Sequence, residues 1–216
     1  MASDYVVQKG DLFDLPMRLL ITGGSYWSER IDLLANFLLR PFSATDHDLY
    51  ANNFSGKNIY IVGLNDTETL NTIISHKQIP KTNIYSDTEG IDLLYDKIET
   101  DFRNAQNDGK TPEHTLVIME HNLSTPIFMK GRGFLISSIV LSKKYSQIPI
   151  GFRENCTGLI VLDSDDDQLE SIYGQHGVPD MTKPMRKEIP PHIKCPRVHF
   201  MVNYSNPIER RFLQLA

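Results

Sequence analysis

The stretch that most constrains this sequence is an apolar strand, a glycine turn and an amphipathic run that follow one another near its start. Residues 17–22 are mostly apolar, Gly23 and Gly24 follow, and the amphipathic run extends from Ile31 to Leu39. Glycines between a buried strand and a helix let the backbone turn sharply, with N–H groups exposed at the helix N-terminus. The stretch therefore predicts a βα unit whose turn faces a ligand.

This turn has the frame of a phosphate-binding P-loop without its charges. The pattern G-x-x-x-x-G-K-[ST] starts at Gly23 and places Ser28 at its second glycine. Glu29 stands at the lysine position, and Arg30 stands at the Ser/Thr position that holds Mg²⁺. A carboxylate there repels phosphate, and the missing lysine removes a charge-assisted contact. Lost hydrolysis is therefore predicted, while weak nucleotide binding stays open. The predicted cofactor-facing residues are Gly23, Gly24, Ser25, Ser28, Glu29 and Arg30.

Apolar strands alternate with helical patterns along the rest of the chain. We predict strands at 59–62, 115–119, 134–141, 158–162 and 199–203, and helices at 91–102 and 165–173. A further short helix is predicted through Leu70 and Ile74, with Asp66 or Thr67 as its N-cap. This alternation predicts an α/β fold, a three-layer P-loop NTPase-like arrangement with a mostly parallel central sheet covered on both faces. Residues 1–175 are predicted to form the ATPase-like domain, and residues 176–216 a basic C-terminal extension with a final strand.

Ligands of such sheets bind beyond the carboxyl ends of the strands. The segments expected to converge there are Gly23–Arg30, Gly63–Asp66, Glu120–Leu123 and Ser142–Lys144. The strand at 115–119 ends in Glu120 and His121, which has the form of a Walker B strand. In that motif the first acidic residue lies near Mg²⁺ and the second polarises the attacking water. An ordinary strand that ends in two polar residues is the open alternative.

Composition narrows the class of protein. A chain of 216 residues with 40% hydrophobic residues can bury one substantial core. The formal net charge of −5 gives no global basic footprint, so a nucleic-acid contact would need a local patch. Cys156 and Cys195 match no metal spacing, which predicts no metal site and a reducing compartment. The sequence shows no signal peptide and no apolar run long enough to span a membrane, so we expect an intracellular protein without a membrane partner.

Taken together, the segments resemble the viral genome-packaging ATPases of the FtsK/HerA type, particularly those of poxviruses and their large-DNA-virus relatives. Residues 15–25 are similar to that family's entry into its P-loop, "P-F-R-M-h-h-T-G-G-S", and residues 116–121 to its Walker B strand. The similarity is strongest over residues 131–149 and in the "R-x-N" match at 153–155. The similarity covers most of residues 15–175, and it is specific because four motifs occur together in the family's order and spacing.

The resemblance implies a set of site residues, cofactors and partners. Lys143 stands where the family has a polar sensor glutamine, while Arg132 and Arg153 match arginines that act in trans at subunit interfaces. Solvated surface arginines are the open alternative for this pair. The implied catalytic positions are Glu120, His121, Lys143, Arg132 and Arg153. ATP with Mg²⁺ is the implied cofactor, packaging subunits and double-stranded DNA are the implied partners, and the host cytoplasm or the virion is the implied location.

Three hypotheses follow from these observations. The first is a non-catalytic, pseudo-ATPase subunit of a genome-packaging or virion-assembly complex, because the order of segments is kept while the catalytic positions are substituted. The second is an active DNA-packaging motor that uses Arg30, Lys143 and Glu120 as replacements. The third is a DNA-binding or protein-interaction module that keeps only the fold and contacts phosphates through the basic residues between 183 and 197.

Overall fold

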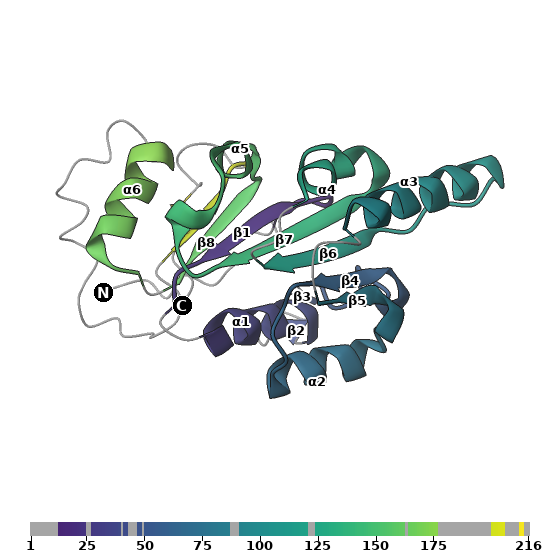
Figure 1. The fold of residues 1–216 in the computed structure, drawn as a ribbon, viewed down its shortest axis with the longest axis horizontal. Coiled ribbons are helices and arrows are strands. Elements are labelled where there is room, and N and C mark those ends of the chain that lie inside the picture. The colour runs from purple at the N-terminus through teal and green to yellow at the C-terminus, as the bar shows by residue number, and fades with distance from the viewer. Residues whose placement is uncertain are drawn as a thin grey trace.

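The chain folds around one mixed sheet of eight strands, in the order β10-β9-β8-β1-β7-β6-β4-β5 (Figure 1). This computed structural model describes residues 13–24, 27–39, 41–42, 47–48, 50–86, 91–120, 124–162, 164–176, 200–205 and 212–213. The strands of the sheet are β1 (Arg18–Thr22), β4 (Ile59–Val62), β5 (Ile84–Tyr85), β6 (Thr115–Glu120), β7 (Ile136–Ser142), β8 (Gly158–Val161), β9 (Phe200–Asn203) and β10 (Phe212–Leu213). A separate antiparallel pair joins β2 (Pro41–Phe42) to β3 (His47–Asp48).

Helices cover both faces of the sheet. The α-helices are α1 (Trp27–Leu39), α2 (Glu68–Lys77), α3 (Ile91–Asn107), α4 (Thr125–Lys130), α5 (Ile150–Asn155) and α6 (Asp166–His176). Short 3₁₀ turns are η2 (Gly56–Asn58), η3 (Lys81–Asn83), η4 (Gly131–Phe134) and η5 (Tyr145–Gln147). Helices α1 and α2 share one hydrophobic cluster with the sheet, and helices α3 to α6 share the other (Figure 1). The three predicted layers are confirmed.

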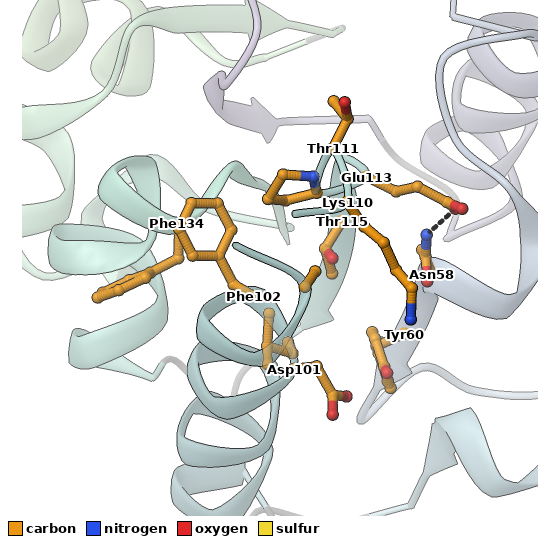
Figure 2. Close-up of a pocket in the computed structure, with 12 residues that line it drawn as sticks. Asn58, Tyr60, Asp101, Phe102, Lys110, Thr111, Glu113, Thr115 and Phe134 are labelled. Atoms are coloured by element: carbon orange, nitrogen blue, oxygen red, sulfur yellow. Dashed lines mark hydrogen bonds between the residues drawn. The ribbon is translucent and has the colours of Figure 1, made fainter. Parts of the chain in front are cut away.

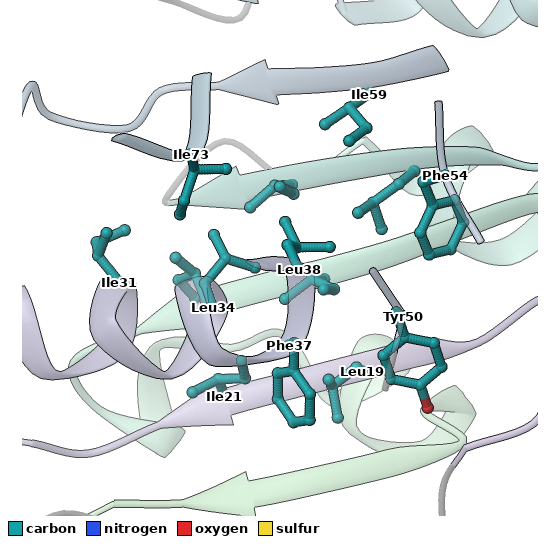
Figure 3. Packing of buried hydrophobic residues seen from close by; sticks show 14 of the residues in the cluster. Leu19, Ile21, Ile31, Leu34, Phe37, Leu38, Tyr50, Phe54, Ile59 and Ile73 are labelled. Atoms are coloured by element: carbon teal, nitrogen blue, oxygen red, sulfur yellow. The ribbon is translucent and has the colours of Figure 1, made fainter. Parts of the chain in front are cut away.

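The apolar character of the central strands follows from this double coverage. In β1, Leu19 and Ile21 face α1, whereas Leu20 faces the opposite cluster. Figure 3 shows Leu34 and Leu38 of α1 in the same cluster as Leu19 and Ile21. A strand that is buried on both faces needs apolar residues at successive positions instead of an alternating pattern. Burying each such side chain contributes roughly 1.5–3 kcal/mol.

The six strands from β8 to β5 run parallel, which confirms the predicted mostly parallel sheet. Strand β7 lies between β1 and β6, with Leu20 opposite Val140 and Ile118 opposite Ile139. The carboxyl ends of β1 and β6 therefore meet the same edge of the sheet, one strand apart. We call this the carboxyl edge, and the opposite one, where the parallel strands begin, the amino edge.

Several element boundaries differ from the predictions. Helix α1 begins at Trp27, four residues before the predicted amphipathic run. The strand predicted to start at residue 134 starts at Ile136, because Phe134 belongs to η4 and Leu135 closes that turn at φ 56°. Helices α4 and α5 were not predicted, since each has only 6 residues and too few turns to show a period. By contrast, α2 begins as predicted, with the Thr67 hydroxyl accepting from the amide of Leu70 at 3.1 Å.

The predicted final strand at 199–203 is β9, although His199 lies outside the described residues. Strand β9 pairs antiparallel with β8, and β10 pairs antiparallel with β9. Residues 177–199 also lie outside the described residues, so the division of the chain after residue 175 stays a prediction. Among the described residues, no helix combines the length and the apolar character needed to cross a bilayer.

Candidate functional site

The loop after β1 lies at the carboxyl edge and turns into α1. Gly23 and Gly24 adopt φ angles of 86° and 80°, a left-handed conformation that side chains with a Cβ adopt at a cost. Ser25 and Tyr26 lie outside the described residues. Because α1 begins at Trp27, Ser28, Glu29 and Arg30 all belong to its first turns.

The guanidinium of Arg30 folds back into this loop. Its side chain is 3% exposed, and Nη1 donates to the carbonyl oxygen of Gly23 at 2.5 Å and to that of Gly24 at 3.4 Å. The guanidinium also lies 5.0 Å from the centre of the Trp27 ring. A phosphate cradle directs backbone N–H groups at its ligand. Here two loop carbonyls are directed at a cation, so this part of the loop has the opposite polarity.

The carboxylate of Glu29 is packed over the same loop. A Cβ built on Gly24 would lie 2.6 Å from Oε2 of Glu29 and 3.6 Å from Nη1 of Arg30. The acid at the lysine position and the arginine at the Ser/Thr position therefore meet above one glycine. Side chains of α1, the helix that follows the loop, therefore occupy the space over Gly23 and Gly24.

A second carboxyl group approaches Arg30 from β6. Glu120 is the last residue of that strand and is 2% exposed. Burial raises the pKa of Glu120 to about 7, and the positive charge of Arg30 opposes this rise. Burial likewise lowers the pKa of Arg30, whereas Glu120 and Glu29 raise it. The buried guanidinium is thus stabilised by two carboxyl groups, one from its own helix and one from β6.

These residues do not fit a magnesium–triphosphate complex. In the pattern, a lysine ammonium reaches the β- and γ-phosphates and a hydroxyl binds Mg²⁺. Glu29 and Arg30 stand at those positions and contact the loop themselves. In the described part of the chain, no group of three or more His, Cys, Asp or Glu side chains is arranged to hold a metal ion.

The structure brings together only some of the four segments that were predicted to converge at the carboxyl ends of the strands. Lys143 is exposed directly after β7, and the charges that shift the pKa of Glu120 include Arg30 but not Lys143. The Gly63–Asp66 segment connects β4 to α2, where Asp66 accepts a hydrogen bond from Asn71 at 2.7 Å. His121, with the rest of the segment after Glu120, lies outside the described residues.

The two arginines implied by the family resemblance occupy different environments. Arg153 lies over the Tyr145 ring at 4.9 Å, and its Nη1 donates to Oε1 of Gln175 at 2.8 Å. The Tyr145 hydroxyl donates to the same oxygen at 2.9 Å. Arg132 is exposed in η4, just before β7, and therefore lies at the amino edge, away from the Gly23–Arg30 loop.

Sequence reasoning missed Trp27 as the partner of Arg30 and Gln175 as the partner of Arg153. Trp27 precedes Arg30 by three residues on one helix, a spacing that places both side chains on the same face. That signal was available once the helix start was known. Gln175 lies in α6, and no local pattern relates it to Arg153.

A hollow of about 220 Å³ lies at the amino edge, between the end of α3 and the starts of β4 and β6 (Figure 2). Charged groups on its rim already have partners. Glu113 accepts from Asn58 at 2.6 Å and from Lys57 at 2.8 Å, and Lys110 pairs with Asp108 at 2.9 Å. Because these charges are offset within the protein, the hollow is a weak candidate for binding a charged ligand.

No family model matches this sequence, and no curated protein matches it either. Solved structures do match. The genome packaging NTPase B204 from Sulfolobus turreted icosahedral virus 2, in complex with AMPPCP, aligns at a TM-score of 0.54 and 12% identity, over 92% of this chain and 96% of that one. Its complex with sulfate aligns at a TM-score of 0.53 and 13% identity, over 89% of this chain and 93% of that one. ATPases 2 and 3 of EssC from Geobacillus thermodenitrificans align at a TM-score of 0.44 and 12% identity, over 77% of this chain and 35% of that one.

The likeness to the packaging NTPase extends over nearly the whole of both chains and establishes the fold. The predicted three-layer, P-loop NTPase-like α/β fold is confirmed. At this identity the likeness does not extend to the chemistry of the loop, which is carried by the residues described above.

Proposed function

We propose that this chain is a packaging-ATPase-like protein that does not hydrolyse ATP and acts as a non-catalytic subunit of a viral genome-packaging or virion-assembly complex. The proposal rests on the loop after β1, where side chains of α1 occupy the space over the glycines. Arg30 donates to the loop carbonyls, and Glu29 lies over Gly24. A triphosphate would have to displace a buried guanidinium and approach a carboxylate, without a lysine to offset the repulsion.

The partners in this proposal come from the resemblance of the sequence and from the fold. The fold is shared with a protein described as a genome packaging NTPase. A chain that keeps this architecture with altered loop charges is suited to fill a subunit position in such an assembly, next to active copies or packaging partners. We propose a homo- or hetero-oligomer, with double-stranded DNA as the further partner.

Binding and turnover of Mg-ATP test the proposal directly. A ligand that binds the native state raises its apparent stability, so the melting temperature should not rise with millimolar Mg-ATP. A triple variant, Ser28→Gly with Glu29→Lys and Arg30→Thr, rebuilds the pattern and should gain such a rise. Its matched control, Glu29→Gln with Arg30→Met, empties the loop without supplying the lysine and should gain none.

The opposite result has a clear signature. Hydrolysis of ATP by the unmodified chain, lost in Glu29→Gln, would overturn the proposal. The Glu29→Gln control matters because turnover by a contaminating ATPase would not respond to it.

A second candidate, an active packaging motor with an atypical site, is favoured by one observation. The guanidinium of Arg30 already lies inside the loop, with Glu120 close enough to raise its pKa. If Arg30 turned towards a bound phosphate, it would supply the missing positive charge. Hydrolysis that double-stranded DNA stimulates and Arg30→Met abolishes would select this candidate.

The third hypothesis, a DNA-binding or protein-interaction module, depends on the basic residues between 183 and 197, which lie outside the described residues. DNA binding that weakens steeply with salt and disappears when those residues are neutralised would favour it.

A further inference from the structure

Two arginines of the amino edge lie at the starts of neighbouring strands. Arg18 is the first residue of β1, and Arg132 lies in η4, which leads into β7. Strands β1 and β7 pair in parallel, with Arg18 opposite Ser138. Arg18 lies two residues from Leu20, on the same face of β1, and Phe134 of η4 packs against the cluster on that face. The charge of Arg132 lowers the pKa of Arg18, after the larger effect of burial.

The backbone of Arg18 is fixed from the other side, by the residue that precedes β8. Its amide donates to Oγ1 of Thr157 at 2.8 Å, and its carbonyl oxygen accepts from the amide of Thr157 at 2.8 Å. These bonds hold the main chain of Arg18 whatever its side chain contacts. The position is therefore built into the sheet and does not depend on a surface loop.

Within the described part of the chain, no acidic side chain offsets the charge of this pair. No salt bridge there includes Arg18 or Arg132. The acidic group whose charge would raise the pKa of Arg18 is the thiol of Cys156. Burial raises the pKa of Cys156 to about 12, so the thiol is neutral at physiological pH.

Two other cations of the same edge have a carboxylate partner. Lys57 binds Glu113 at 2.8 Å, and Arg103 binds Glu99 at 2.7 Å. Arg18 differs from these two, because it is half-buried and its charged neighbour is a second arginine. Partly desolvated like charges destabilise each other unless an anion lies between them.

We propose that Arg18 and Arg132 together form a binding site for a phosphate group at the amino edge of the sheet. Each guanidinium offers a planar fork of N–H donors that matches two oxygens of one phosphate, and two positive charges match its double negative charge. The phosphate group can come from free inorganic phosphate or from the backbone of a nucleic acid. The site lies at the opposite edge from the Gly23–Arg30 loop, so it goes beyond the proposed function and does not depend on it.

Calorimetric titration of the full chain with inorganic phosphate tests the site. Phosphate should bind, and chloride at matched ionic strength should not. The double variant Arg18→Met with Arg132→Met should weaken phosphate binding at least about tenfold, because each charge-assisted contact is worth about that much. Arg103→Met, which removes a paired arginine from the same edge, is the matched control and should leave binding unchanged.

A short DNA duplex in place of phosphate identifies the source. If the source is nucleic acid, the duplex should bind too, and the double variant should lower the salt dependence of its affinity by about two phosphate contacts. Binding of phosphate alone assigns the site to free phosphate. The proposal is overturned if the unmodified chain does not bind phosphate, or if the double variant binds it equally well. Arg132→Met alone, at an exposed position, should still weaken binding, so a folding defect at Arg18 cannot hide the answer.

Discussion

Arg30 and Arg18 are arginines on adjacent elements at opposite edges of the same sheet, yet they are in contrasting electrostatic states. Arg30 is buried, donates to two carbonyl oxygens and lies near two carboxyl groups. Arg18 is half-buried next to Arg132 and forms no salt bridge in the described part of the chain. The positive charge at the carboxyl edge thus has partners within the protein. At the far edge, positive charge is left for an external partner.

This contrast teaches that a site cannot be judged from residue type alone. A buried charge with internal partners is a structural feature, and removing it strongly destabilises the protein. A charge without internal partners is open to an external one. Four measurements can break or sharpen this division, in order of decreasing expected effect.

Removing the guanidinium of the loop should have the largest effect. We expect Arg30→Met to lower the free energy of unfolding by about 3–5 kcal/mol, because Glu29 and Glu120 then lose the charge that offsets their burial. Urea denaturation measures this loss. Arg103→Met, which breaks an exposed helical pair with Glu99, is the control and should cost about 0.3–0.5 kcal/mol. An equal cost for the two variants would contradict the contrast between internally paired and surface arginines.

A pH dependence from the same loop should be next in size. The pKa of Glu120 is raised from 4.5 to about 7, so between these values the folded protein holds a proton that the unfolded chain releases. The free energy of unfolding should therefore fall as the pH rises from about 4.5 to about 7, by roughly 3 kcal/mol from this group.

Glu120→Gln isolates this effect, because glutamine cannot titrate. Its stability should lack this group's pH-dependent loss, and the difference between the two proteins should grow as the pH rises. A difference that stays constant between pH 4.5 and pH 7 would show that Glu120 titrates normally, and the loop would then be less enclosed than the structure indicates.

Glycines at the two edges should differ in how they tolerate a methyl group. Gly24 and Gly109 both have positive φ, 80° and 68°, but only Gly24 has neighbours within 4 Å of the place that an added Cβ would occupy. Gly109→Ala should cost roughly 1 kcal/mol from backbone strain, and Gly24→Ala roughly 2 kcal/mol, because its methyl group also pushes the Glu29 carboxylate aside. Thermal denaturation ranks the two. Equal losses would mean that the Glu29 carboxylate moves aside at little cost and is not held in place over Gly24.

The smallest effect is expected at Arg18. In chloride buffer without phosphate, Arg18→Met should change the free energy of unfolding by no more than about 0.5 kcal/mol, because the main-chain bonds to Thr157 remain and the repulsion from Arg132 disappears. The measurement is a urea titration in parallel with Arg30→Met. A loss above about 1.5 kcal/mol would reveal an internal partner for Arg18, and the two arginines would no longer differ.

The order of elements was accessible from the sequence because it depends on local patterns. The apolar strand before Gly23 became β1, the run at 59–62 became β4 with the same bounds, and Thr67 caps α2. Shorter elements were missed for a local reason too: α4 and α5 have 6 residues each, and β5 has 2, which is too few to show a period.

The candidate site was accessible in part. The substitutions at Glu29 and Arg30 were visible in the pattern, and they predicted a loop with the wrong charges for phosphate. The internal contacts of those side chains were not visible, because they depend on the direction of the Gly23 carbonyl and on where α1 begins. Likewise, Arg153 matched a trans-acting arginine in the sequence, whereas in the structure it binds Gln175, 22 residues away.

The sequence by itself determined the α/β class, the strand–loop–helix unit at Gly23 and the acid and arginine at positions 29 and 30, since each is encoded within a few consecutive residues. Only the tertiary structure decided that β7 separates β1 from β6, that Glu120 approaches Arg30, and that Arg18 lies beside Arg132. The physical reason is that these relations join residues far apart along the chain. They depend on how the sheet orders its strands and on which charges burial then forces together.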